Sequence, residues 1–203
     1  MTETAGIARW IHDLAGSDER AKIESAMRLY LAGVSLCTPL LSRWVSDPEF
    51  RELTLPGQPA GEPHARSQPS AIVVGIAVEP DTFQKIRAAN NSPRLARVPP
   101  DQDAQEFELH LNASLEFDIL TTREPGGPGA ISRYLQKFGE GIQQIEIYVR
   151  DVDRATEILR TRFALAPLYP ATRPGADGTR VNFFLATGPD AKKVLIELVE
   201  AAR

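Results

Sequence analysis

The chain has 203 residues, of which 42% are hydrophobic and 25% are charged, an ordinary composition for a globular protein that can bury a core. A net charge of −4 gives no electrostatic attraction to nucleic acid or to an anionic membrane, and no apolar run approaches the length of a membrane span. The single cysteine, Cys37, excludes an internal disulfide and is expected to be buried by packing. Because the N-terminus also lacks the pattern of a signal peptide, we expect a cytoplasmic protein whose partner is a small molecule.

Residues 1–55 carry apolar side chains at helical spacing and are predicted to form an N-terminal helical segment. The first helix contains Trp10 and ends at Gly16, and the second begins with Ser17 as its N-cap. A third, short helix contains Trp44. The two tryptophans indicate that this segment packs against something. Covering the site, forming a homodimer and binding another partner all remain open roles for it.

Residues 56–70 contain four prolines and two glycines and are predicted to be a linker or a long surface loop. From 71 to 203 the order strand, helix, strand, strand occurs twice, which indicates an internal duplication. Between its helix and its next strand, the first copy has only the proline-rich stretch SPRLARVPPDQDAQ, a poor strand candidate.

Four stretches of this region carry a resemblance to a known family. They are GIAV (75–78), ISRYLQKFGEGIQQI (131–145), RPGADGTRVNF (173–183) and VLIELVE (194–200). On these residues the chain resembles the vicinal oxygen chelate superfamily of glyoxalase I, bleomycin-resistance proteins and extradiol dioxygenases, and most closely its methylmalonyl-CoA epimerases. The resemblance implies an α+β fold in which paired βαβββ modules form a glyoxalase-like cup, here preceded by the N-terminal helical segment.

The resemblance also implies a divalent metal held by four strand-borne ligands. The place of the family's first histidine is occupied by Val73, which cannot ligate, while the other three places fall on Asp118, Gln144 and Glu197. Gln143 and Gln144 together replace the family's pair of histidines. An all-oxygen donor set suits magnesium, manganese or calcium better than zinc. The sequence leaves open whether any cation binds.

Strand alternation is an independent guide to which side chains share the concave face. It puts one set of polar residues there together: Glu116, Asp118, Gln144, Glu146, Tyr148 and Glu197. The same alternation allows His110 to point into the cup, although a lone histidine on a strand is more often a surface residue. We therefore take Glu146, Tyr148 and His110 as candidate ligand-binding residues. The resemblance implies that Glu197 is the candidate catalytic residue, since it can serve there as a metal ligand or a base.

Two functions follow from these residues. The first is a divergent epimerase-like protein that binds a small acid or an acyl thioester, with metal-assisted proton transfer as in an isomerase, epimerase or lyase of this superfamily. The second is a metal-free, bleomycin-resistance-like protein that binds its ligand without catalysis. Asp118 and Glu197 favour the first function, whereas Val73 favours the second. Whether the protein is an enzyme stays open at this point.

Overall fold

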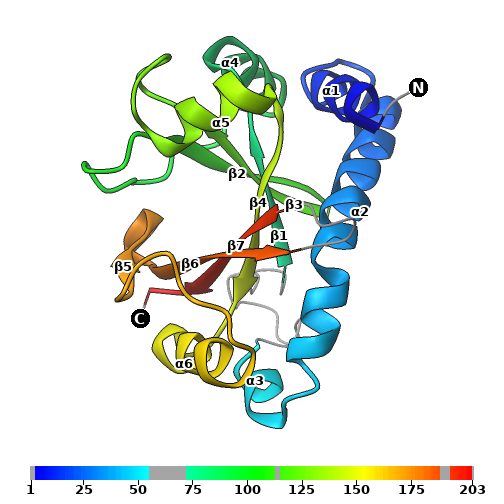
Figure 1. Ribbon diagram of the computed structural model, residues 1–203. Coiled ribbons are helices and arrows are strands. Elements are labelled where there is room, and N and C mark those ends of the chain that lie inside the picture. Colours follow the sequence, from blue (N-terminus) through cyan, green and yellow to red (C-terminus); the bar gives the residue numbers. More distant parts are fainter. Residues whose placement is uncertain (1–2, 55–71, 113–114, 188–192, 203) are drawn as a thin grey trace. The chain divides into compact units, whose positions relative to one another are not determined.

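The computed structural model describes residues 3–54, 72–112, 115–187 and 193–202 (Figure 1). The chain forms two compact units, the first made of Met1–Gly33 and Val74–Gln143 and the second of Val34–Val73 and Gln144–Arg203. The predicted linker at 56–70 lies outside the described residues. The domain boundaries proposed on either side of it stay a prediction.

Three helices form the N-terminal segment, as expected, but their limits differ from the prediction. They are α1 (Glu3–Asp13), α2 (Glu19–Trp44) and α3 (Pro48–Leu53). The second and third predicted helices are one helix of 26 residues, which contains Pro39. Proline inside a helix removes a backbone hydrogen bond, and burial of Cys37 and Trp44 on either side offsets part of that cost. No helix in the described part of the chain is long and apolar enough to cross a membrane.

The N-cap of α2 is Asp18 rather than Ser17. The Asp18 carboxylate accepts hydrogen bonds from the backbone N–H groups of Arg20 and Ala21, at 3.0 and 3.2 Å. Aspartate and serine satisfy the unpaired donors of the first helical turn about equally well. Because both residues are present side by side, the local backbone conformation decides which of them is the N-cap.

The first unit contains most of the first module. Its elements are β1 (Ile72–Ala77), α4 (Pro80–Ala89), β2 (Gln105–Asn112), β3 (Leu115–Thr121) and α5 (Ala130–Phe138). β3 lies between β1, which is parallel to it, and β2, which is antiparallel. α4 packs on β3 (Figure 1), and its Phe83 ring meets Phe107 of β2 edge-on at 4.9 Å between centroids. Phe83 and Ile86 lie about one turn apart on α4 and are fully buried.

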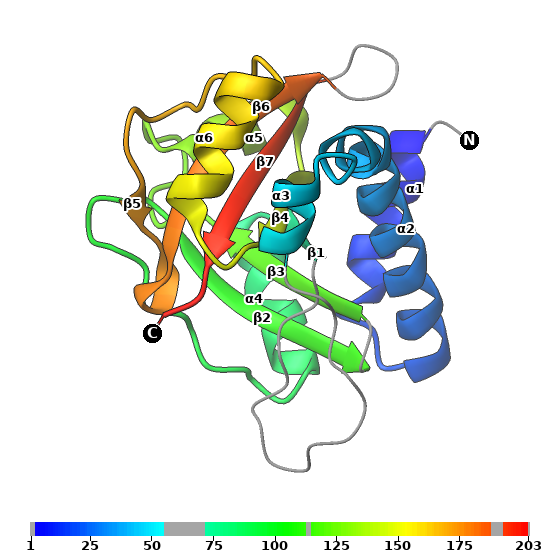
Figure 2. The ribbon, with the colours of Figure 1, turned by 90° about the horizontal axis from the view of Figure 1, so that it is seen from below.

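The second unit contains most of the second module. Its elements are β4 (Gly141–Tyr148), α6 (Val152–Arg162), β5 (Arg173–Pro174), the 3₁₀ helix η1 (Ala176–Gly178), β6 (Arg180–Thr187) and β7 (Lys193–Glu200). β7 lies between β4, which is parallel to it, and β6, which is antiparallel, and β5 extends the sheet at β6. Figure 2 shows α6 running along β6 and β7, which it contacts.

The two modules share the expected strand and helix order and confirm the α+β class. They differ after the helix, where the second module has the short strand β5 and the described residues of the first have none. In each module the segment after the helix still bonds to the next strand. The N–H of Ala96 donates to the carbonyl of Glu106 at 3.0 Å, and the N–H of Leu168 donates to that of Phe183 at 2.7 Å. The two modules are therefore similar in this segment as well, although the first module forms no strand in the described residues between α4 and β2.

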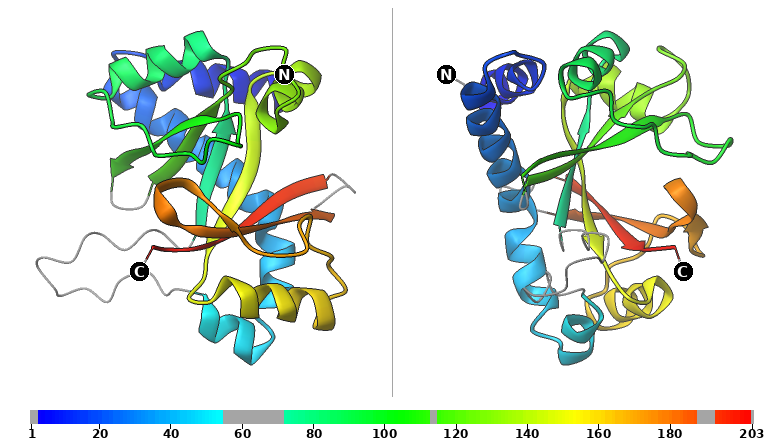
Figure 3. Two further views of the ribbon diagram at one scale, coloured as in Figure 1. Left: turned by 90° about the vertical axis from the view of Figure 1, so that its left-hand side faces the viewer. Right: turned by 180° about the vertical axis from the view of Figure 1, so that it is seen from behind.

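An ion-pair network joins α3 to α6, which lie beside each other in both views of Figure 3. Arg162 pairs with Asp47 and with Glu49, and Arg154 also pairs with Glu49. Hydrogen bonds from Arg162 and from the backbone of Phe50 hold the pKa of Asp47 below its usual value. Hydrogen bonds from Arg154 and Arg162 lower the pKa of Glu49 in the same way.

Cys37 is fully buried, as predicted, and its Sγ donates to the carbonyl of Val34 at 3.3 Å. Burial raises the pKa of the thiol to about 11. A thiol that stays protonated at neutral pH is a poor nucleophile and metal ligand, so Cys37 is a packing residue.

Candidate functional site

Two buried carboxylates lie opposite each other in the sheet of the second unit. Glu146 of β4 pairs in register with Glu197 of β7, and Glu197 pairs with Phe183 of β6. Directly paired residues of adjacent strands point to the same face, so these three side chains form one row, which we call the Glu197 row. Glu146 is 7% exposed and Glu197 is 8% exposed. Alternation along β4 puts Gln144 and Tyr148 on this face as well, as the sequence predicted.

The Gln144 side chain connects the two carboxylates. Its Nε2 donates to Glu197 Oε2 at 2.7 Å and to Glu146 Oε1 at 3.1 Å. Buried carboxylates are costly unless they accept hydrogen bonds or bind a cation, and one amide supplies bonds to both of them here. Gln144, Glu146 and Glu197, which were predicted to share the concave face, are therefore in contact.

Next to the Glu197 row lies an apolar cluster that contains Val73. Val73 packs with Tyr148, Val181 and Val199, and Phe183 contacts the cluster from the row. Val73 is 2% exposed. At the position where the family resemblance expects the first histidine, this chain therefore has a buried packing residue. Tyr148 belongs to this cluster and lies two residues after Glu146 on the same face of β4.

Two further residues adjoin the row, and sequence reasoning did not assign them a role. The Tyr169 ring meets Phe183 edge-on at 6.0 Å between centroids, and the Arg173 guanidinium lies 4.5 Å from the centre of the Tyr169 ring. An arginine stacked on an aromatic ring in this way is held in place and can attract an anionic group. Arg173 lies in the RPGADGTRVNF stretch that carries the family resemblance. This location is the sequence signal from which a role for Arg173 could have been inferred.

The first unit has a separate group of candidate ligands around His110. His110 pairs in register with Glu116, and Glu108 pairs with Asp118. His110 Nε2 lies 3.2 Å from Glu108 Oε2, and its Nδ1 lies 3.8 Å from Glu116 Oε1. Among the described residues, Glu108, His110 and Glu116 are the one set of three such side chains whose ligand atoms all lie within 4.8 Å of one another. His110, predicted only as a ligand-binding residue, thus belongs to a carboxylate–histidine cluster.

The two groups differ in how well they fit a divalent cation. Glu108, His110 and Glu116 offer oxygen and imidazole donors at once, a set that several divalent cations accept. In the second unit the carboxylates suit a hard cation, but the nitrogen of the Gln144 amide faces them. Gln144 would have to turn its amide over before its oxygen could ligate. Asp118 is 8% exposed and lies in the first unit, and its joint role with Gln144 and Glu197 stays a prediction.

Comparisons with known proteins support the glyoxalase-like fold. No family model matches the chain, and no curated protein sequence matches it. Among solved structures, methylmalonyl-CoA epimerase from Mycobacterium tuberculosis is 27% identical over 66% of this chain and 89% of its own, with a TM-score of 0.53. A variant of the Streptomyces coelicolor methylmalonyl-CoA epimerase, in complex with 2-nitronate-propionyl-CoA, is 26% identical over 64% of this chain and 92% of its own, also with a TM-score of 0.53.

A hypothetical protein from Bacillus halodurans matches at 22% identity over 64% of this chain and 92% of its own, with a TM-score of 0.52. That similarity shows the fold alone. The chain therefore has a glyoxalase-like fold similar to that of methylmalonyl-CoA epimerases, with the N-terminal helices in addition.

Proposed function

We propose that the Glu197 row binds a small acid or an acyl thioester. The observation that carries this proposal is the single amide of Gln144 joined to two buried carboxylates, where Gln144 and Glu197 stand at positions at which the family resemblance places ligands. Support comes from the structural similarity to epimerases, one of which is in complex with 2-nitronate-propionyl-CoA and another with methylmalonyl-CoA and NH4+. Arg173, stacked on Tyr169, supplies a cation for a carboxylate of the ligand.

In the catalytic form of this proposal, Glu197 removes a proton from the carbon next to the thioester carbonyl. The C–H bond breaks, the proton goes to the Glu197 carboxylate, and the electron pair moves onto the carbonyl oxygen to give an enolate. Return of a proton from Glu197 to the same face of that carbon exchanges its hydrogen, whereas inversion of the centre requires a second acid that delivers a proton to the opposite face. A divalent cation, when bound, would stabilise the charge on the oxygen. Gln144 holds the Glu197 carboxylate in one orientation, and the apolar cluster around Tyr148 excludes water from one side.

The second candidate is binding without metal and without catalysis. Two observations favour it, namely that Val73 stands where the resemblance expects a histidine, and that the nitrogen of Gln144 faces the carboxylates. In this form, the row and Arg173 recognise the ligand, and no proton is transferred.

Exchange of the hydrogen next to the thioester carbonyl of methylmalonyl-CoA tests the two forms. Mass spectrometry would follow deuterium uptake from D₂O, with magnesium or manganese in one arm and EDTA in the other. The catalytic form predicts accelerated exchange that Glu197→Gln reduces about 100-fold or more, a typical loss for a missing general base, and that an exposed control, Glu24→Gln, preserves. Saturable binding without exchange would support the metal-free form, and absence of both would reject the proposal.

A further inference from the structure

A half-open pocket lies in the second unit, between α6, β6 and the chain that connects them. Its volume is about 440 Å³, within the range of small-molecule sites, and it shares no lining residue with the Glu197 row. α6 contributes residues at positions one turn apart, and the connecting chain contributes an apolar wall of Pro167, Pro170 and Ala171. We call this cavity the α6 pocket.

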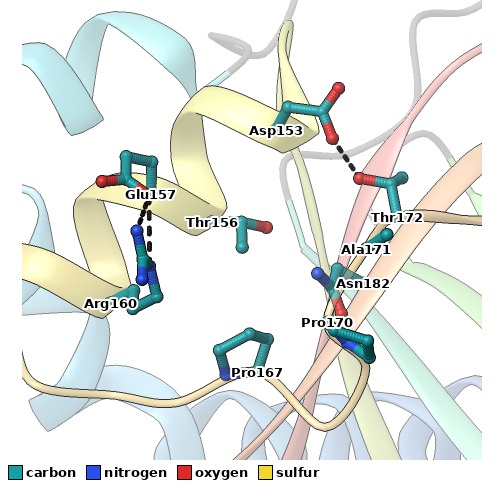
Figure 4. A pocket seen from close by; sticks show the side chains of 9 residues that line it. All are labelled: Asp153, Thr156, Glu157, Arg160, Pro167, Pro170, Ala171, Thr172 and Asn182. Atoms are coloured by element: carbon teal, nitrogen blue, oxygen red, sulfur yellow. Dashed lines mark hydrogen bonds and ion pairs between the residues drawn. The ribbon is translucent and has the colours of Figure 1, made fainter.

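Two polar atoms at the α6 pocket have no hydrogen-bond partner among the described residues. They are Nδ2 of Asn182, on β6, and Oγ1 of Thr156, on α6. Figure 4 shows these two side chains facing each other across the pocket. Asn182 is only 1% exposed, and its Oδ1 already accepts the N–H of Phe183 at 2.9 Å. A buried donor without an acceptor is costly, so its presence at a cavity points to a bound group that accepts this bond.

The charged residues of the α6 pocket are paired with each other or with neighbours. Arg160 donates to Glu157 Oε2 from both its Nε and its Nη2, at 3.1 and 2.6 Å. Asp153 accepts hydrogen bonds from Thr172 and Arg180, which hold its pKa below the usual value. The groups left to recognise a ligand are thus a neutral amide donor, a hydroxyl that can donate or accept, and apolar surface.

We propose that the α6 pocket binds an uncharged carboxamide. The carbonyl oxygen of such a ligand accepts from Asn182 Nδ2, its N–H group donates to Thr156 Oγ1, and its apolar part lies against the proline wall. An anionic ligand of the same shape would have to give up its hydration in a pocket whose charged groups are already paired with each other or with neighbours. The pocket therefore discriminates between a carboxamide and the matching carboxylate.

Titration calorimetry with benzamide and benzoate tests this inference on the full-length protein. Benzamide should bind saturably and benzoate about tenfold more weakly or not at all. Asn182→Asp keeps the oxygen that accepts from Phe183 but removes the donor, and Thr156→Val removes the hydroxyl at nearly constant shape. Each should weaken benzamide binding about fivefold to tenfold, the loss expected for one hydrogen bond.

Ser132→Ala is the matched control. The Ser132 hydroxyl also lacks a partner among the described residues, but it lies on α5 and does not line the pocket. This variant should bind benzamide like the wild type. The inference is overturned if benzamide does not bind, if benzoate binds equally well, or if Thr156→Val and a folded Asn182→Asp both keep wild-type affinity. Neither probe is a thioester, so the outcome is separate from that of methylmalonyl-CoA exchange.

Discussion

Gln143 and Gln144 are adjacent on β4, yet their side chains are in different surroundings. The Gln144 amide bridges two buried carboxylates, whereas Gln143 Oε1 is buried and makes no hydrogen bond within the described residues. Neighbouring residues on a strand point to opposite faces, and this alternation separates the two amides. Only Gln144 therefore belongs to the proposed site.

Leucine substitutions at these two positions test that difference. Gln144→Leu removes the donor shared by Glu146 and Glu197 and should lower the free energy of unfolding by about 1–3 kcal/mol, the cost of losing hydrogen bonds to buried charged acceptors. Gln143→Leu removes a buried oxygen that makes no such bond, so it should be neutral or stabilising. Urea denaturation of both variants measures the two effects. Equal losses would contradict the bridging role of Gln144.

At the scale of elements, α3 and α6 are connected by side chains that the sequence places about a hundred residues apart. Arg162 and Arg154 of α6 reach Asp47 and Glu49 at the start of α3. Asp47 also caps α3 by accepting from the N–H groups of Glu49 and Phe50, both at 3.0 Å. The same carboxylate thus begins the helix and anchors it to α6.

Stability should fall on acidification because of this network. A carboxylate whose pKa is lowered on folding stabilises the protein above its unfolded pKa, and this contribution is lost as the pH falls through the folded value. The lowered pKa values of Asp47 and Glu49 therefore predict that the denaturation midpoint drops as the pH falls through and below the usual range of carboxylate pKa values. Arg162→Met should make the drop smaller.

The control for this measurement is Arg160→Met. Arg160 pairs with Glu157 inside α6 and does not take part in the ion pairs to α3. Its pH profile should match that of the wild type. A wild-type profile for Arg162→Met as well would show that the contact between α3 and α6 does not contribute to acid sensitivity.

Most elements of the two modules could be predicted from sequence, because their apolar residues alternate with a clear period. The hairpin β2–β3 and the buried face of α4 follow directly from that pattern. The join of two predicted helices into α2 could not be predicted. Proline has a low helix propensity, so Pro39 disfavours a continuous helix when only the local sequence is considered. Burial of Cys37 and Trp44 in the folded protein stabilises the continuous helix.

The candidate site was predictable in part for the same reason. Alternation placed Gln144, Glu146 and Glu197 on one face, and strand register brings them into contact. The stacking of Arg173 on Tyr169 and the α6 pocket depend on how loops fold back on the sheet, and no period in the sequence encodes this. The same applies to the grouping of His110 with Glu108 and Glu116, which required the register of β2 and β3.

At the scale of the whole molecule, the similarity to solved epimerases extends over about two thirds of the chain, 66% in the case of the Mycobacterium tuberculosis protein. The N-terminal helices come in addition to that fold. A homodimer, a cytoplasmic location and a bleomycin-resistance-like role stay predictions. The similarity supports the fold, and a ligand site of the epimerase type remains our proposal, in which Val73 and Gln144 stand at positions where the resemblance expects histidines.

The central claim is that the Glu197 row recognises the acyl part of a thioester. Titration calorimetry with propionyl-CoA and with free coenzyme A tests it directly, on the wild type and on Gln144→Leu. We predict that the wild type binds propionyl-CoA about tenfold more tightly than coenzyme A, and that Gln144→Leu loses this preference while it remains folded. Equal affinity of the wild type for the two ligands, or an unchanged preference in Gln144→Leu, would contradict the proposed site.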